Sequence, residues 1–151
     1  MTNDAVAREI LDANSYVVLA TADADGVPWA SPVWFAREDS DLYWMSHPGA
    51  RHSQNIAVRS QIAMVVFDSR VTPGSGQGVY MAASAEQLMN PDTLESGMAV
   101  VSRKSVRGGD GEWGVDRVTE PARLRLYRAR VLESWILDPD SPFDVRVGVR
   151  P

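Results

Sequence analysis

The residues best suited to binding chemistry lie where a predicted strand ends and a short predicted helix begins. Ser46, His47 and Pro48 follow an apolar run, and Arg51 and His52 come directly after Gly-Ala. Ser46 or His47 can cap a helix, and Pro48 suits its first turn. Free N–H groups at a helix N-terminus attract anions, and Arg51 and His52 lie just inside this one. The pattern predicts an anion site, which we interpret as a place for the phosphate of a cofactor.

An aromatic hairpin precedes this anion site. Val33–Phe35 and Leu42–Met45 are short apolar and aromatic runs, separated by the charged turn Arg37–Asp41. Two such runs around a polar turn predict a pair of antiparallel strands. We expect this hairpin to hold a flat ring beside the phosphate. Its indoles, Trp34 and Trp44, suit a core or a dimer interface as well as a ring contact, and for Trp34 we expect contact through the main chain.

The composition sets limits on the class of protein. A length of 151 residues suits one domain spanning residues 1–151, and 44% hydrophobic with 23% charged residues suits a folded core. A net charge of −5 argues against a nucleic-acid-binding surface. The absence of Cys excludes disulfides, thiol nucleophiles and thiolate metal sites, and two His are too few for an ordinary zinc site.

The sequence also limits the compartment. No apolar run approaches the ~20 residues that span a bilayer. The acidic N-terminus lacks the basic and then apolar order of a signal peptide. We therefore expect a cytoplasmic protein with no membrane partner and no nucleic-acid partner.

The elements that must position the anion site are mainly strands. We predict strands over 16–21, 27–36, 42–45, 62–67, 79–88, 122–132, 135–137 and 145–149. We predict three short helices, over 4–13 with Asn3 or Asp4 as its cap, from about 46 to 59, and from Asn90 to about Ser102. Pro28 and Pro32 would place parts of the second strand at an edge or a bulge.

The remaining polar stretches are expected to be loops. Residues 69–78 and the Gly-rich stretch 104–115 have loop composition, and Trp113 in the second is either a lid over the ring or simply part of a mobile loop. About seven strands with mostly hairpin connections favour an antiparallel barrel with peripheral helices.

The residues now described resemble the pyridoxamine 5′-phosphate oxidase-like family of flavin-binding split barrels. The resemblance rests on Ala20-Thr21, Asp25–Pro28, Ser31–Phe35, Leu42–Ser46 and Arg51–Ile56, in that order and spacing. It runs from the first helix to about residue 88, and more loosely through 124–149. It implies a mainly β fold, an antiparallel split barrel of six to seven strands, and homodimers with two flavins at the interface. FMN is the usual cofactor in that family, while some relatives bind the deazaflavin F420 and others bind haem or nothing.

The resemblance also implies roles for individual residues. The strand from Ser31 to Phe35 would lie along the isoalloxazine ring, and Met45 and Ser46 would meet the ribityl chain and the phosphate. Arg51 and His52 occupy the positions of an Arg-Lys pair that grips the phosphate. The partner subunit would bring Gln77 or Gly78 to the ring. The predicted cofactor-binding residues are Ser31, Pro32, Val33, Trp34, Trp44, Met45, Ser46, Arg51, His52, Ser53, Gln77 and Gly78.

Three departures from the family pattern bear on function. His52 replaces the phosphate-binding Lys, so the charge at this position would change with pH around about 6.5. Ser31 replaces an Arg of the first strand, which removes another phosphate contact. The C-terminal Arg and His pattern that reads pyridoxamine phosphate is absent, which argues against oxidation of vitamin B6 itself.

These expectations combine into one functional hypothesis with open alternatives. We expect an FMN-binding, flavin-dependent oxidoreductase that acts on a small molecule as a cytoplasmic homodimer. An F420-dependent reductase and a non-catalytic flavin carrier or sensor are the alternatives. The cofactor carries out hydride or electron transfer, so no side chain is assigned as catalytic and no metal is expected.

Overall fold

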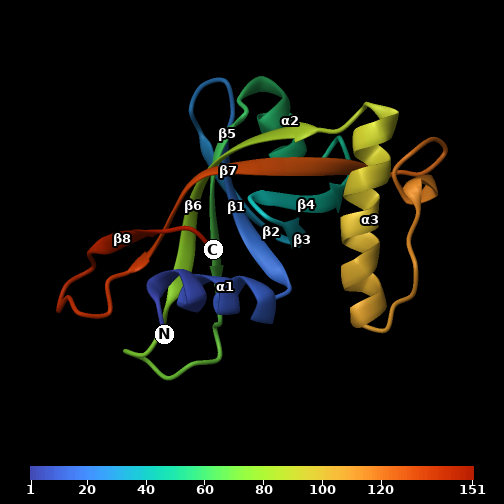
Figure 1. Cartoon of the computed structure of the whole chain (residues 1–151). Helices are drawn as coiled ribbons and strands as arrows, with labels where there is room; N and C mark the ends of the chain where they lie inside the picture. Colours follow the sequence, from blue (N-terminus) through green and yellow to red (C-terminus); the bar gives the residue numbers. More distant parts are fainter.

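The computed structural model describes all 151 residues, which form one eight-stranded sheet with three α-helices and a 3-10 turn (Figure 1). In chain order the elements are α1 Asn3–Ala13, β1 Tyr16–Ala22, β2 Pro28–Trp34, β3 Ala36–Glu38, β4 Asp41–Ser46, α2 Arg51–Val58, β5 Gln61–Phe67, β6 Gly78–Gln87, α3 Pro91–Arg107, η1 Val115–Arg117, β7 Arg125–Leu137 and β8 Arg146–Val149.

The sheet curls until its two ends are joined by one stretch of chain. Its order is β2-β1-β5-β6-β7-β4-β3, with β8 added beside β7, and all neighbours are antiparallel. The end strands β2 and β3 are separated along the chain only by Phe35. One nearly continuous segment therefore pairs with β1 at one end and with β4 at the other. The predicted antiparallel split barrel is confirmed.

Two hydrophobic cores follow from the alternation of side chains along the strands. In β4, Leu42 and Trp44 point into the barrel and belong to a core of 20 buried residues, which Ala7 and Leu11 of α1 help to close. Tyr43 and Met45 point the other way, toward a second core that α3 covers. In Figure 1, α1 lies across one end of the barrel and α3 stands beside β4 and β7.

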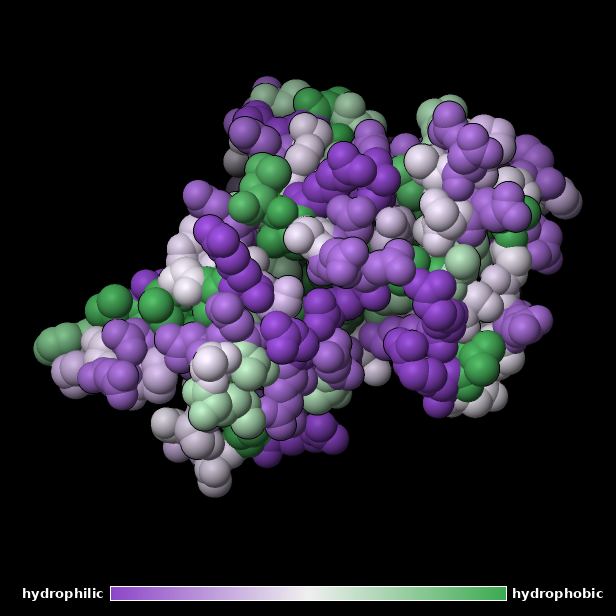
Figure 2. Space-filling model, in the orientation of Figure 1, coloured by the Kyte–Doolittle hydropathy of each residue, from purple (hydrophilic) through white to green (hydrophobic).

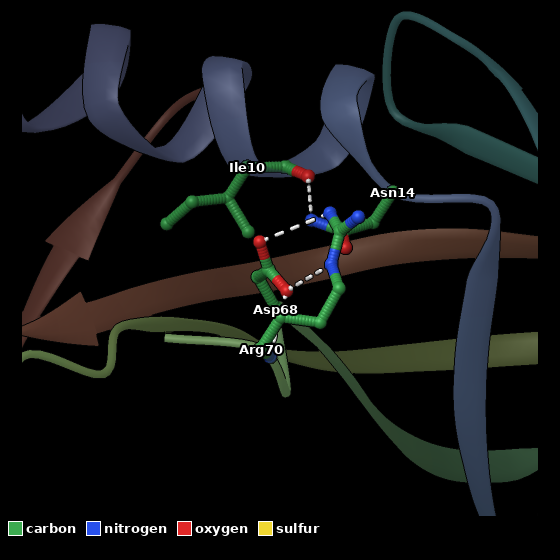
Figure 3. A network of polar contacts seen from close by, with 4 residues as sticks. All are labelled: Ile10, Asn14, Asp68 and Arg70. Carbon is green, nitrogen blue, oxygen red and sulfur yellow. Dashed lines mark hydrogen bonds and ion pairs between the residues drawn. The ribbon is translucent and has the colours of Figure 1, made fainter. Parts of the chain in front are cut away.

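The chain leaves α1 through a polar junction (Figure 3). The Asn14 side-chain amide donates to the Ile10 carbonyl at 2.8 Å, which satisfies one of the free carbonyls at the end of the helix. Nearby in the same view, the Arg70 guanidinium pairs with both carboxylate oxygens of Asp68, at 2.9 and 3.2 Å. The other end of α1 is capped by Thr2, whose hydroxyl accepts from the Ala5 N–H at 3.1 Å, so the predicted caps Asn3 and Asp4 were one or two residues late.

The aromatic hairpin does not form between the two predicted segments, 33–35 and 42–45. Val33 pairs with Val17 of β1, and Leu42 pairs with Arg37 of β3. The turn is correspondingly shorter, and Asp39 adopts a positive φ of 51° within it. The break at Phe35 explains the difference, because it ends one pairing and begins the other.

Two further segments differ from the sequence prediction. α3 continues to Arg107 because buried residues such as Val101 and Ser105 extend its apolar face, so residues 104–107 are helical and not part of a loop. The two predicted strands 122–132 and 135–137 are one strand, β7, whose pairing with β6 shifts between Ala82 and Ala83. The shift leaves Leu132 without a partner on β6, and such a bulge bends a long strand.

The edge position predicted for the second strand is confirmed. β2 ends the sheet, and Pro28 and Pro32 lie opposite Ala22 and Val18 of β1, four positions apart in the register, so both prolines have the same orientation toward β1. A proline lacks the N–H that a central strand would need, so these positions suit an edge. None of the helices combines the length and the apolar character that crossing a membrane requires.

Candidate functional site

The candidate anion site is formed where β4 ends and α2 begins. After Ser46 the chain makes a turn in which the Gly49 N–H donates to His47 Nδ1 at 2.9 Å and the Ala50 N–H donates to the His47 carbonyl at 3.0 Å. α2 starts at Arg51, with Ala50 as its cap and no side chain bound to its first N–H groups. We predicted Ser46 or His47 as the helix cap and Pro48 in the first turn. Both predictions were wrong, because residues 47–50 form a turn that precedes the helix.

Ser46 and His52 lie together, as the predicted site requires. The Ser46 hydroxyl and His52 Nε2 are 2.8 Å apart, and the Ser46 residue is buried. Burial lowers the pKa of His52 below its ordinary value of 6.5. The imidazole is therefore neutral at pH 7, and it contributes a hydrogen-bonding group and not a charge.

Arg51 and Ser53 both lack the partners that such groups normally have. The Arg51 guanidinium forms no ion pair or hydrogen bond in the chain, and its central carbon lies 4.4 Å from the centre of the Trp29 ring. The Ser53 hydroxyl is buried and has no hydrogen-bond partner. A buried hydroxyl without a partner is costly, so this one fits an oxygen that a ligand would bring. Both lie in the first turn of α2, where backbone N–H groups also point outward.

Four of the predicted cofactor-binding residues line one groove. The groove has a volume of about 720 Å³, and Pro32, Val33, Trp34 and Met45 contribute to its walls. Its other lining residues are Ser15, Tyr16, Asp110, Trp113 and Leu124. The lining is mostly apolar and aromatic, which suits a flat ring system.

Trp113 forms part of the groove and is not a separate lid. Its ring centre lies 5.5 Å from that of Trp34, at an angle of 52°, and its backbone N–H donates to the Ser102 hydroxyl at 2.9 Å. The Arg117 guanidinium lies 4.2 Å from the Trp113 ring centre. These contacts fix Trp113 beside α3. The sequence did not predict them, because Trp113 stands alone in a Gly-rich stretch.

Two predicted residues on the barrel strands have less access to a ligand. Ser31 is half-buried on β2, opposite Leu19. The Trp44 side chain is completely buried and stacks on Tyr127 at 6.0 Å and 11°. No face of the Trp44 ring is open to a ligand in this arrangement, and the residue acts as the largest member of the barrel core.

Gln77 and Gly78 lie apart from the anion site within one chain. They stand at the start of β6, whereas the other end of β6 pairs with Tyr127, the neighbour of Trp44. The Gln77 amide donates to the Leu137 carbonyl at 2.8 Å and accepts from the Leu137 N–H at 2.9 Å. A role for Gln77 or Gly78 at the ring therefore needs a second subunit, and it stays a prediction.

One residue of the arrangement had no role in the sequence prediction. Trp29 lies under the Arg51 guanidinium and is 43% exposed. The available signal was its position on a proline-flanked edge strand, two residues before Ser31.

Comparisons with known proteins agree with this architecture. The sequence model of the pyridoxamine 5′-phosphate oxidase family matches residues 4–132. No curated protein sequence matches the chain.

Several solved structures share the fold at low sequence identity. HutZ, the heme storage protein from Vibrio cholerae, has a TM-score of 0.70 and 19% identity over 87% of this chain and 91% of its own. A heme binding protein from Mycobacterium smegmatis has a TM-score of 0.74 and 17% identity over 98% of this chain, which spans 58% of that protein. A putative pyridoxamine 5′-phosphate oxidase from Listeria innocua has a TM-score of 0.65 and 16% identity over 89% of this chain and 97% of its own. With the split barrel and the family match over most of its length, the chain belongs to the pyridoxamine 5′-phosphate oxidase-like family.

Proposed function

We propose that the chain binds FMN and works as a flavin-dependent oxidoreductase on a small molecule. The observation that carries the proposal is that the first turn of α2, which has no side-chain cap, holds both the buried, unpartnered Ser53 hydroxyl and the unpaired Arg51. This group of donors suits a phosphate, because a cation, a hydroxyl and backbone N–H groups all bind oxyanions.

The groove lined by Pro32, Val33, Trp34 and Met45 supports a ring ligand. Its volume of about 720 Å³ lies within the range of small-molecule sites, and Met45 directly precedes Ser46 on β4. Under this proposal Pro32, Val33 and Trp34 lie along the ring, and Ser46, Arg51, His52 and Ser53 hold the phosphate. Ser31 would make a minor contact, and Trp44 would support the ring strand from inside the barrel.

When bound, FMN supplies the hydride or electron transfer. The residues of the chain bind and orient it, and the apolar walls of the groove exclude water from one side. No side chain is proposed as a general acid or base.

We further propose that the site is completed in a cytoplasmic homodimer, where Gln77 or Gly78 of a second copy approaches the groove. Exposed apolar side chains at the β5–β6 and β7–β8 connections, among them Phe67 and Phe143, support an interface on the side that carries Gln77. An F420-dependent reductase and a flavin carrier or sensor remain as alternatives at the same site.

Haem is a second candidate ligand, and the exposed His47 is the residue that would bind its iron. Its Nδ1 accepts from the Gly49 N–H, so the neutral ring carries its proton on Nε2, and iron binding at Nε2 requires the other tautomer and the loss of this hydrogen bond. Two similar structures are those of heme proteins. The donors around Ser53 have no part in iron binding, so FMN explains more of the site.

The visible spectrum of freshly purified protein tests the proposal. We expect the two-band spectrum of an oxidised flavin, and mass spectrometry of the released cofactor should give FMN. F420 would give a single band and a heavier molecule, and haem would give an intense Soret band. Protein that is colourless and stays so after titration with FMN would contradict the proposal. Turnover with NADH or NADPH and oxygen then separates an enzyme from a carrier.

A further inference from the structure

Trp29 and Arg51 form the best-defined contact at the anion site. The guanidinium lies over the ring at 4.4 Å from its centre, close enough for a cation–π interaction. Stacking covers one flat face of the guanidinium and leaves its N–H edge free. An arginine held in this way has lost much of its rotamer freedom before a ligand arrives.

The backbone of Trp29 is held by two consecutive hydrogen bonds between buried side chains and its carbonyl. The Asn55 amide donates to the Thr21 hydroxyl at 3.0 Å, and this hydroxyl donates to the Trp29 carbonyl at 3.4 Å. Thr21 and Asn55 are each only 4% exposed. Asn55 lies one turn after Arg51 on α2, so the same helix contacts Trp29 at its ring and, through Thr21, at its backbone.

We propose that Trp29 is a positioning residue for Arg51, and that it gives the site its preference for a phosphomonoester over the same ring system without phosphate. This inference rests on the proposed function, since the proposed function places the phosphate of FMN at Arg51. Trp29 does not touch the ring of the ligand. It acts by restricting the Arg51 guanidinium at the first turn of α2, which also carries Ser53 and N–H groups without a side-chain cap.

The test compares FMN with riboflavin, which has the same ring and no phosphate. In Trp29→Leu the affinity for FMN should fall roughly three- to tenfold, while the affinity for riboflavin stays that of the parent. Trp29→Phe keeps an aromatic face and should recover most of the loss. Once Arg51 has been changed to Ala, Trp29→Leu should cause no further loss. Met89→Leu, at an exposed residue between β6 and α3, is the control and should bind both flavins like the parent.

Two results would overturn the inference. One is an unchanged FMN affinity in a Trp29→Leu protein with parental circular dichroism. The other is an equal loss for FMN and riboflavin, which would place Trp29 at the ring or in the fold.

Inorganic phosphate separates this inference from the proposed function. If no flavin binds the parent, but phosphate raises its Tm and does not raise that of Trp29→Leu, the positioning role stands and the FMN proposal fails. If neither flavin nor phosphate has any effect on the parent, both fail.

Discussion

Arg51 supplies the positive charge of the candidate phosphate site at neutral pH, because the neighbouring His52 is partly buried and neutral. We expect Arg51→Ala to weaken FMN binding by about tenfold or more, from the loss of roughly 1.5–3 kcal/mol in charged hydrogen bonds. Arg51→Lys should recover only part of this, since Lys cannot make a two-pronged contact. Arg59→Ala, at the other end of α2, is the control in a flavin titration. Equal affinities for Arg51→Ala and the parent would remove Arg51 from the site.

His52 should make the stability of the ligand-free protein depend on pH. Its pKa is lowered in the folded state, so below pH 6.5 the unfolded chain binds more protons than the folded one. The free energy of unfolding should therefore fall as the pH drops through 6.5. Urea unfolding of the parent and of His52→Gln between pH 7.5 and 5 measures this. The stability of the parent should fall more steeply, and parallel curves would show that His52 is not desolvated.

The individual side chains were predictable to different degrees. Ser46, Arg51, His52 and Ser53 are close in the sequence, and a strand followed by a helix brings them together. Trp44 shows the limit, because a tryptophan on a strand suits either face and only the barrel register turns it inward. Trp29 was missed because its partner Arg51 lies on another element.

At the scale of elements, the one glycine of α3, Gly97, lies close to side chains of the sheet. A Cβ on Gly97 would lie 2.8 Å from Leu126 Cδ2 and 2.9 Å from Tyr43 Cε1. Gly97→Ala should therefore destabilise the protein by about 1–3 kcal/mol, although Ala is the better helix former. Ser96→Ala on the exposed face of α3 is the control in chemical denaturation. If Gly97→Ala were more stable than the parent, α3 would not pack this closely.

Lys104 joins α3 to the place where the barrel closes. Its ammonium donates to the carbonyls of Asn14 and Phe35, and lies 4.3 Å from the ring centre of Phe35 and 5.0 Å from that of Trp34. Burial lowers the pKa of Lys104 to about 8, with the nearby positive charge of Arg107 acting in the same direction.

The chain has one lysine, so this titration can be followed directly. After reductive methylation with ¹³C, the methyl resonance of Lys104 should titrate near pH 8 in the folded protein and near 10.5 in urea. Between these values the unfolded chain holds a proton that the folded chain has lost. The free energy of unfolding of the parent should therefore rise with pH across this window, relative to Lys104→Met. A titration near 10.5 in the folded protein would contradict the burial of the amine.

The elements themselves were largely predictable, because alternation and turn residues are local signals. The boundaries that failed depend on contacts distant in sequence. α3 runs past Ser102 because Val101 and Ser105 are buried, Ser105 by the segment after the helix, where its hydroxyl donates to the Gly111 carbonyl. The strand around Phe35 breaks because it pairs with β1 on one side and with β4 on the other.

At the scale of the whole molecule, we expect a homodimer. The side of the barrel that carries the β5–β6 and β7–β8 connections exposes Phe67, Val71, Phe143 and Val145. Figure 2 shows apolar residues on the segment that projects from the body. Two-fold pairing would bury such surface and bring Gln77 near a second groove. Sedimentation at micromolar protein should give twice the mass of 16.6 kDa, and a monomer at that concentration would contradict the expectation.

The segment from Pro28 to Glu38 has two duties, because it completes the circle of strands and also forms one wall of the groove. A ligand seated against that wall would contact the segment that pairs with β1 on one side of Phe35 and with β4 on the other. Filling the groove would therefore raise the free energy of unfolding through eleven consecutive residues that belong to both the barrel and the site.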